Sequence, residues 1–268
     1  MAGATGCGQR RGRPCSREGI AMRWLLLVFL GLSLTAAEGK GETSLPSPPF
    51  VREWTHESGD DTQIIGAWNQ TLCYSSKEGL GALDPASGKL LWRVRAGVHV
   101  AGAVLHRNRI YAVAPVEKGA ELLEVEAASG RERVLARLPV PGRYVEVGGG
   151  RVFVLDNAGT VHAWDIATGK PHWSRTLVRR SQETWPFAEL AWTPGGLYVA
   201  IEVAEWGFGD RYEAVRFGLN PTRGHVRWQR KGGPDYHLPP LGLDEDVIVY
   251  GDGPLRLQVA TGKVVWRR

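Results

Sequence analysis

A nine-residue pattern that recurs along this chain limits the folds available to it more than any other feature of the sequence. In its clearest copy, Asp165 is followed by Gly169 four positions later and by Trp173 eight positions later. The residues before Asp165 have the period-two arrangement of a pleated strand. The aspartate can accept backbone N–H groups in a turn, and the glycine can adopt a positive φ without steric cost. The pattern therefore predicts a strand, a tight turn and a second strand that begins with tryptophan.

The same spacing occurs at five places, and most copies are separated by a similar length of chain. Its defining residues are Asp84, Gly88 and Trp92; Glu126, Gly130 and Val134; Asp165, Gly169 and Trp173; Asn220, Gly224 and Trp228; and Gln258, Gly262 and Trp266. Repetition at a period of roughly 40 residues, built from short strands and glycine turns, is typical of the blades of a β-propeller rather than of a helical solenoid. Trp54 precedes Trp92 by a similar interval and is expected to take the tryptophan position of an N-terminal strand.

Further strands can be recognised between the copies of the pattern, and several are apolar on both faces, as expected for a sheet packed between two others. We expect an all-β chain: a β-propeller of about five four-stranded blades, or an incomplete part of a larger propeller. The expected strands are Gln63–Trp68, Thr71–Ser76, Ala101–Leu105, Arg109–Val113, Tyr144–Val147, Arg151–Asp156, Leu197–Glu205 and Val247–Tyr250.

Charge and cysteine content exclude two classes of function. The formal net charge is +5, but residues 1–37 hold five arginines and one acidic residue, so the remainder is nearly neutral. Such a surface lacks the basic footprint of a nucleic-acid-binding protein. Cys73 is the one cysteine after the N-terminal apolar segment, so a processed chain has no internal disulfide. We interpret Cys73 as a small buried apolar residue rather than a nucleophile.

The N-terminal region is expected to direct export. Residues 1–21 form a disordered or untranslated extension, and Met22 is the expected start. Residues 22–37 have a basic start, an apolar centre and small residues at the end, which is typical of a secretory signal peptide. The alternative is an uncleaved anchor. The apolar run is, however, too short to span a bilayer stably. Residues 38–49 form a Pro-rich linker, and residues 50–268 form the propeller. We expect a protein of the periplasm, of the cell envelope or secreted.

One interval is longer than the others, and its extra residues are candidates for partner binding. It runs from Trp173 to Trp228, and its aromatic side chains are mixed with arginines and acids. Loops carry function more often than strands, and aromatic residues are enriched at binding hot spots. The alternative is that these aromatics close over the edge of their own blade. The candidate contact residues are Trp185, Trp192, Trp206, Phe208 and Tyr212.

The pattern Asp-x-x-x-Gly-Lys-x-x-Trp resembles the tryptophan-docking repeat of pyrroloquinoline-quinone-type (PQQ-like) β-propellers over most of residues 50–268. In that family the tryptophans dock against the next blade, which implies the same structural role for Trp92, Trp173, Trp228 and Trp266. The family includes quinone-dependent dehydrogenases and cofactor-free members, among them the propeller subunit of the outer-membrane β-barrel assembly machinery. Its propellers commonly have seven or eight blades, so a five-bladed chain is expected either to close on itself or to associate through open blade edges.

The resemblance implies a choice between an enzyme and a scaffold. Quinone dehydrogenases of the family need a metal with carboxylate ligands and often adjacent cysteines, and this chain lacks the cysteine pair. Its carboxylates and histidines have no spacing that specifies a metal site. We therefore expect no catalytic, metal or cofactor site, and an exported, non-catalytic scaffold that binds protein partners in the cell envelope. The alternatives are a quinone-dependent dehydrogenase and a propeller that binds a small ligand in its central funnel.

Overall fold

The computed structural model describes residues 55–56, 61–100, 102–178, 188–204, 212–232, 239–250 and 253–268, without the side chains of residues 202–204 and 212–213. All of them belong to one unit of the chain, Arg52–Arg268. They form strands and turns, and in these ranges there is no helix long and apolar enough to span a membrane. The prediction of an all-β chain is confirmed.

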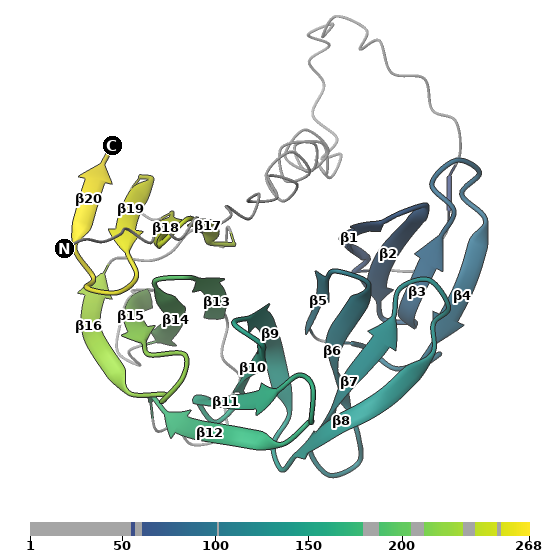
Figure 1. Ribbon diagram of the computed structural model, residues 1–268, viewed down its shortest axis with the longest axis horizontal. Helices are drawn as coiled ribbons and strands as arrows, with labels where there is room; N and C mark the ends of the chain where they lie inside the picture. Colours follow the sequence, from purple (N-terminus) through teal and green to yellow (C-terminus); the bar gives the residue numbers. More distant parts are fainter. Residues whose placement is uncertain are drawn as a thin grey trace, which may run out of the picture. The chain divides into compact units, whose positions relative to one another are not determined.

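The described strands form five four-stranded antiparallel sheets, each a simple meander of strands consecutive in sequence (Figure 1). We number the sheets 1 to 5 along the chain. Sheet 1 holds β1 (Gln63–Trp68), β2 (Thr71–Ser76), β3 (Gly79–Leu83) and β4 (Leu90–Val94); sheet 2 holds β5 (Gly102–His106), β6 (Arg109–Pro115), β7 (Ala120–Glu126) and β8 (Glu132–Leu138); sheet 3 holds β9 (Gly142–Gly148), β10 (Arg151–Asp156), β11 (Thr160–Asp165) and β12 (Pro171–Thr176); sheet 4 holds β13 (Ala188–Thr193), β14 (Gly196–Ala204), β15 (Tyr212–Leu219) and β16 (Val226–Gly232); sheet 5 holds β17 (Leu241–Leu243), β18 (Asp246–Val249), β19 (Leu255–Gln258) and β20 (Val264–Arg267).

Successive sheets pack through their first strands, since β1 contacts β5, β5 contacts β9, β9 contacts β13 and β13 contacts β17. The third and fourth strands of every sheet pair with a one-residue shift in register, as at Ala163/Trp164 in sheet 3. In sheets 1, 3, 4 and 5 the shift lies next to the turn of the recurring pattern, and in sheet 2 it lies between Leu122 and Leu123, further from the turn. At each shift the extra residue changes the direction of the outer strand. The five predicted hairpins are therefore the third and fourth strands of the five sheets.

The core lies between the sheets, because the middle strands are buried on both faces. In β10, Val152 and Val154 pack in the cluster shared with sheet 2, whereas Phe153 and Leu155 pack in the cluster shared with sheet 4. Their side chains are at most 2% exposed. Alternate residues of a strand point to opposite faces, so a continuous apolar run is what a doubly covered strand requires.

Cys73 on β2 belongs to the cluster between sheets 1 and 2 and is 0% exposed. Burial raises the pKa of its thiol to about 11. The thiolate is the nucleophile. We therefore predict that iodoacetamide at pH 8.5 labels Cys73 about 100-fold or more slowly in the native chain than in urea. The measurement needs a Cys7→Ser/Cys15→Ser variant, and equal labelling rates in the two states would contradict the buried position.

Candidate functional site

The turn between the third and fourth strands is fixed by its own side chains. Asp165 Oδ1 accepts hydrogen bonds from the backbone N–H and the hydroxyl of Thr168, both at 2.8 Å. The hydroxyl bond is the main cause that lowers the pKa of Asp165 below its usual value. Gly169 donates its N–H to the Asp165 carbonyl at 2.8 Å with a φ of 66°. The aspartate and glycine thus hold the outer strand at a set angle to the strand before it.

Three tryptophans each dock on the turn of the sheet that follows their own. Trp92 donates its indole N–H to the carbonyl of Ala127 at 2.9 Å, Trp173 to that of Pro221 at 3.0 Å, and Trp228 to that of Val259 at 2.7 Å. Each acceptor directly follows the first residue of a turn, and each indole ring lies against the glycine of the same turn. These glycines are Gly130, Gly224 and Gly262, where a Cβ would come within 2.5 to 2.8 Å of the ring.

Two copies of the pattern differ from this arrangement. Val134 takes the tryptophan position in sheet 2 and is 44% exposed. The turn glycine of sheet 3, Gly169, is instead approached by the carbonyl oxygen of Leu135, which would lie 3.2 Å from an added Cβ. In sheet 5, Trp266 is 36% exposed. Contacts between a tryptophan and the next turn are therefore seen for sheets 1, 3 and 4.

The docking contacts bring the turns between the third and fourth strands of successive sheets to one side. The opposite ends of the strands therefore also lie together. We call this opposite side the loop end. The short β2–β3, β6–β7 and β10–β11 turns lie there, and the connection from each sheet to the next begins and ends there. The connection between β14 and β15 also starts and finishes there. The three long connections of sheet 4, before β13, between β14 and β15, and after β16, therefore all begin and end at the loop end.

The candidate contact residues belong mainly to these connections. Trp185, Trp206 and Phe208 lie outside the described residues. Tyr212 is the first residue of β15, and its side chain is outside the description. Trp192 lies in β13, half-buried, and packs against the core cluster between sheets 3 and 4. Part of the extra length of this sheet extends β14 to nine residues and β15 to eight.

Trp192 also contacts the neighbouring sheet. A Cβ added at Gly148, at the end of β9, would overlap its indole ring, and one at Gly149 would lie 3.4 Å from its Nε1 atom. The glycines at the turn between β9 and β10 thus leave room for an aromatic side chain of the next sheet. Trp192 therefore contributes to the packing between sheets 3 and 4.

Two carboxylates and one histidine that the structure describes are engaged in contacts within the protein. Asp246 accepts from Arg256 Nε at 2.7 Å, and Asp61 lies 2.9 Å from Lys77 Nζ. His162 lies 2.8 Å from Asp156 and stacks on Trp164. Within the described ranges, no three histidine, cysteine or acidic side chains gather in a way that could hold a metal ion. Asp60, Glu205 and Asp210 and the side chain of Glu202 lie outside these ranges.

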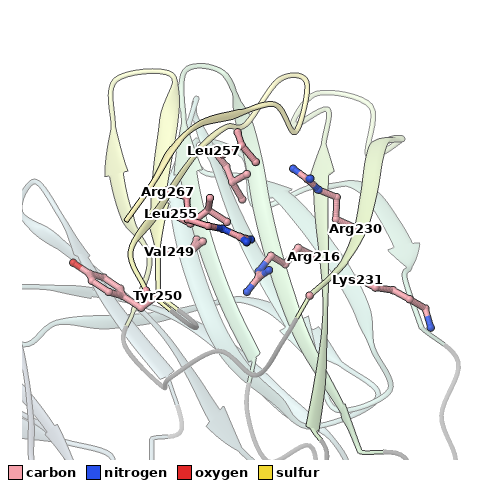
Figure 2. A pocket seen from close by; sticks show the side chains of 11 residues that line it. Arg216, Arg230, Lys231, Val249, Tyr250, Leu255, Leu257 and Arg267 are labelled. Carbon is pink, nitrogen blue, oxygen red and sulfur yellow. The ribbon is translucent and has the colours of Figure 1, made fainter.

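A basic pocket between sheets 4 and 5 was not predicted from the sequence (Figure 2). Sheet 4 contributes Arg216 on β15 and Arg230 and Lys231 on β16, and sheet 5 contributes Arg267 on β20. Arg216 is buried, at 7% exposure, whereas the other three are exposed. The pocket has a volume of about 90 Å³, and its apolar wall is formed by Val249, Leu255, Leu257 and Val264.

Comparison with known proteins places this architecture in a family. The sequence model of the family described as outer membrane protein assembly factor BamB matches residues 54–137, 76–237 and 136–268. Among curated proteins, none matches the chain significantly.

Solved structures with a similar fold include BamB from Moraxella catarrhalis, with a TM-score of 0.53 and 19% identity over 76% of this chain and 63% of that one. The computationally designed Ika8 protein has a TM-score of 0.49 at 14% identity, over 75% and 56% of the two chains. PorZ, a surface component of the type-IX secretion system of Porphyromonas gingivalis, has a TM-score of 0.47 at 16% identity, over 75% and 25%. The present chain spans less than two thirds of the Moraxella protein's length. Because the family matches extend from residue 54 to residue 268, the chain belongs to the family of the outer membrane protein assembly factor BamB.

Proposed function

We propose that this protein is an exported, non-catalytic propeller that binds protein partners and acts as a scaffold in outer-membrane assembly. The observation that carries the proposal is the match of the whole propeller region to the family of an outer membrane protein assembly factor. A scaffold of this kind needs a rigid frame and a variable surface. The five interlocked sheets provide the frame, and loops presented by a frame are where binding residues concentrate.

The loop end is the surface that suits a partner. At the opposite end, the turns are occupied by their own hydrogen bonds and by the docking tryptophans, which leaves them little freedom to vary. Two connections that begin and end at the loop end contain candidate residues in their sequence. Trp185 belongs to residues 177–187, between sheets 3 and 4, and Trp206 and Phe208 belong to residues 205–211, between β14 and β15. Tryptophan and arginine are the residues most enriched among binding hot spots.

The proposal places the mature chain outside the cytoplasm. Residues 22–37 would act as the signal peptide and residues 38–49 as a linker to the propeller, which begins near residue 50. A partner in the periplasm or at the inner face of the outer membrane would then be within reach. Self-association through the edges of sheets 1 and 5 stays a prediction.

Site-specific photo-crosslinking in the cells that produce the protein tests the proposal. We expect a photoreactive amino acid in place of Trp206, in the connection between β14 and β15, to yield a covalent adduct with an envelope protein. The same amino acid in place of Lys89, which is exposed at the turn end, should yield none. Adducts of equal yield at both positions, or a chain that stays in the cytoplasm, would contradict the proposal.

Alanine substitution then separates binding from folding. For this test the photoreactive amino acid is moved to a second loop-end position. Trp206→Ala and Trp185→Ala should then reduce the yield of the adduct by about tenfold or more. Their melting temperatures should stay within about 2 °C of wild type, since surface substitutions usually change stability little. A large fall in melting temperature would show instead that these aromatics form a satellite core over the edge of sheet 4.

A further inference from the structure

Sheet 5 (β17–β20 in Figure 1) packs on sheet 4 with one of its two faces. Val247 and Leu257 belong to the core cluster between these two sheets. Because alternate residues of a strand point to opposite faces, their neighbours in the sequence point away from sheet 4. The strand register joins such residues in one row across the sheet, which consists of Leu241, Ile248, Arg256 and Trp266. Leu243 and Asp246, which pair with each other, lie on the same face. We call the surface of these side chains the outer face of sheet 5.

The outer face combines exposed apolar side chains with one ion pair. Leu241, Leu243 and Trp266 are between 36% and 38% exposed. Arg256 donates its Nε–H to Asp246 Oδ2 at 2.7 Å. The face therefore presents one acid and one base side by side, among apolar residues.

The arginine distinguishes this face from the faces on which the next sheet docks. In sheets 1, 3 and 4 the docking tryptophan is paired across the strands with a small residue; the pairs are Trp92 with Ala82, Trp173 with Ala163, and Trp228 with Gly218. A Cβ added at Gly218 would overlap the indole of Trp228, so the small residue lets the ring lie close to the sheet. In sheet 5 the residue paired with Trp266 is Arg256. The outer face thus differs from a surface that receives a further sheet.

A surface with an acid and a base side by side is complementary to itself. In a dimer with two-fold symmetry, the same surface of both copies forms the contact. The rotation can place Arg256 of each copy over Asp246 of the other. A guanidinium has five donors and a carboxylate accepts several hydrogen bonds, so these groups can bind across the interface and also keep each other. Tryptophan and arginine, as in Trp266 and Arg256, are the residues most enriched among binding hot spots.

We propose that the outer face of sheet 5 is a contact between two copies of this chain, related by a two-fold axis that crosses the Asp246–Arg256 pairs. Interfaces of standard size involve about 20–30 residues a side, so a contact centred on this face is small and the dimer is weak. The contact uses a sheet face, and neither the loop end nor a strand edge. It therefore does not rest on the proposed function, since an envelope protein can bind the loop end of a monomer or of a dimer.

Sedimentation velocity of the purified full chain tests the proposal, at protein concentrations from about 1 µM to about 1 mM, which cover the affinities expected of a small interface. We expect a reversible rise from the monomer mass toward the dimer mass. Arg256→Asp leaves two acids on the outer face, and Asp246→Arg leaves two bases. Each variant alone should dimerise about tenfold or more weakly, because like charges then meet. An equal mixture of the two should dimerise again, since opposite charges meet across the interface.

Two further variants separate the outer face from other surfaces. Trp266→Ala keeps both charges and should weaken the dimer by about tenfold or more. Arg175→Asp makes the same change of charge at an exposed arginine of β12 and should leave the dissociation constant unchanged. Circular dichroism shows whether each variant folds. Asp246 is 8% exposed, so if Asp246→Arg does not fold, Arg256→Asp and Trp266→Ala provide the test.

Three results would overturn the proposal. The first is a chain that stays monomeric at the highest concentration. The second is an association that Arg256→Asp and Trp266→Ala leave unchanged, which would place the contact on the strand edges or on the apolar residues 22–37. The third is growth beyond two copies, because a two-fold contact closes at the dimer.

Discussion

Replacing Trp173 with alanine is expected to lower the free energy of unfolding by about 3–5 kcal/mol, the range for large aromatic deletions at packed sites. The indole ring packs against the turn of sheet 4, donates its N–H to the carbonyl of Pro221, and lies 5.9 Å from the ring of Phe153. Its removal opens a space between sheets 3 and 4 and leaves that carbonyl without the indole donor. Urea unfolding of the variant, followed by tryptophan fluorescence and circular dichroism, measures the loss.

Trp266→Ala is the matched control because it removes the same residue from the same position of the pattern. Trp266 is 36% exposed, so we expect a loss of at most about 1 kcal/mol. Trp173→Phe should fall between the two, since it keeps most of the ring area and loses the hydrogen bond, which contributes about 1 kcal/mol. If Trp173→Ala and Trp266→Ala cost the same, docking on the next sheet would not be what makes Trp173 important.

Replacing Gly224 with alanine is expected to cost about 2–5 kcal/mol, by two separate mechanisms. The φ of Gly224 is 69°, a conformation in which a side chain costs about 1–2 kcal/mol. The new Cβ would also lie 2.5 Å from Cε3 and 2.6 Å from Cδ2 of Trp173, so the ring must move away from the turn. Overpacking of this kind typically costs about 1–3 kcal/mol. The same unfolding measurement provides the value.

Gly97→Ala separates the two mechanisms. Gly97 has a φ of 75°, and an added Cβ there would have no atom within 4 Å, so only the backbone cost of about 1–2 kcal/mol is expected. A double-mutant cycle gives a second check. With Trp173 replaced by alanine, Gly224→Ala should cost no more than Gly97→Ala, because the ring that it would meet is gone. A Gly224→Ala cost that persists unchanged in that background would place the conflict elsewhere.

Much of the fold could be predicted from the sequence because the turn chemistry repeats. An acidic or amide side chain, a glycine at positive φ and a tryptophan, all at fixed spacing, specify one hairpin. The chain between successive copies has the length of a propeller blade, which leaves room for two more strands. The predicted strands at Gln63–Trp68, Thr71–Ser76 and Arg151–Asp156 have the observed bounds. The contact of Leu135 with Gly169 could not be predicted in this way. A backbone carbonyl takes the place of the indole ring there, and a backbone carbonyl leaves no signal in the sequence.

The candidate site was harder to predict because its residues do not repeat. Aromatic side chains in a long interval can serve a core or a partner, and the sequence alone gives no burial. Trp192 illustrates this, because it lies against Gly148 of the preceding sheet, far from it in the sequence. The basic pocket did leave a signal, because aligning the copies of the pattern places Arg216 beside Leu80, Leu122 and Val161. The turn residues alone do not reveal it.

The docking tryptophans reach only from one sheet to the next. Neighbouring sheets are therefore coupled in pairs, like links in a chain, and coupling of this kind attenuates beyond the nearest neighbour. A sheet held from both sides can acquire new residues in its connections without passing strain to sheets further away. Sheet 4 is held from both sides in this way, by Trp173 of sheet 3 and by its own Trp228, which contacts sheet 5. The tryptophan contacts that stabilise the propeller therefore also allow the connections of one blade to change in sequence independently of the other blades.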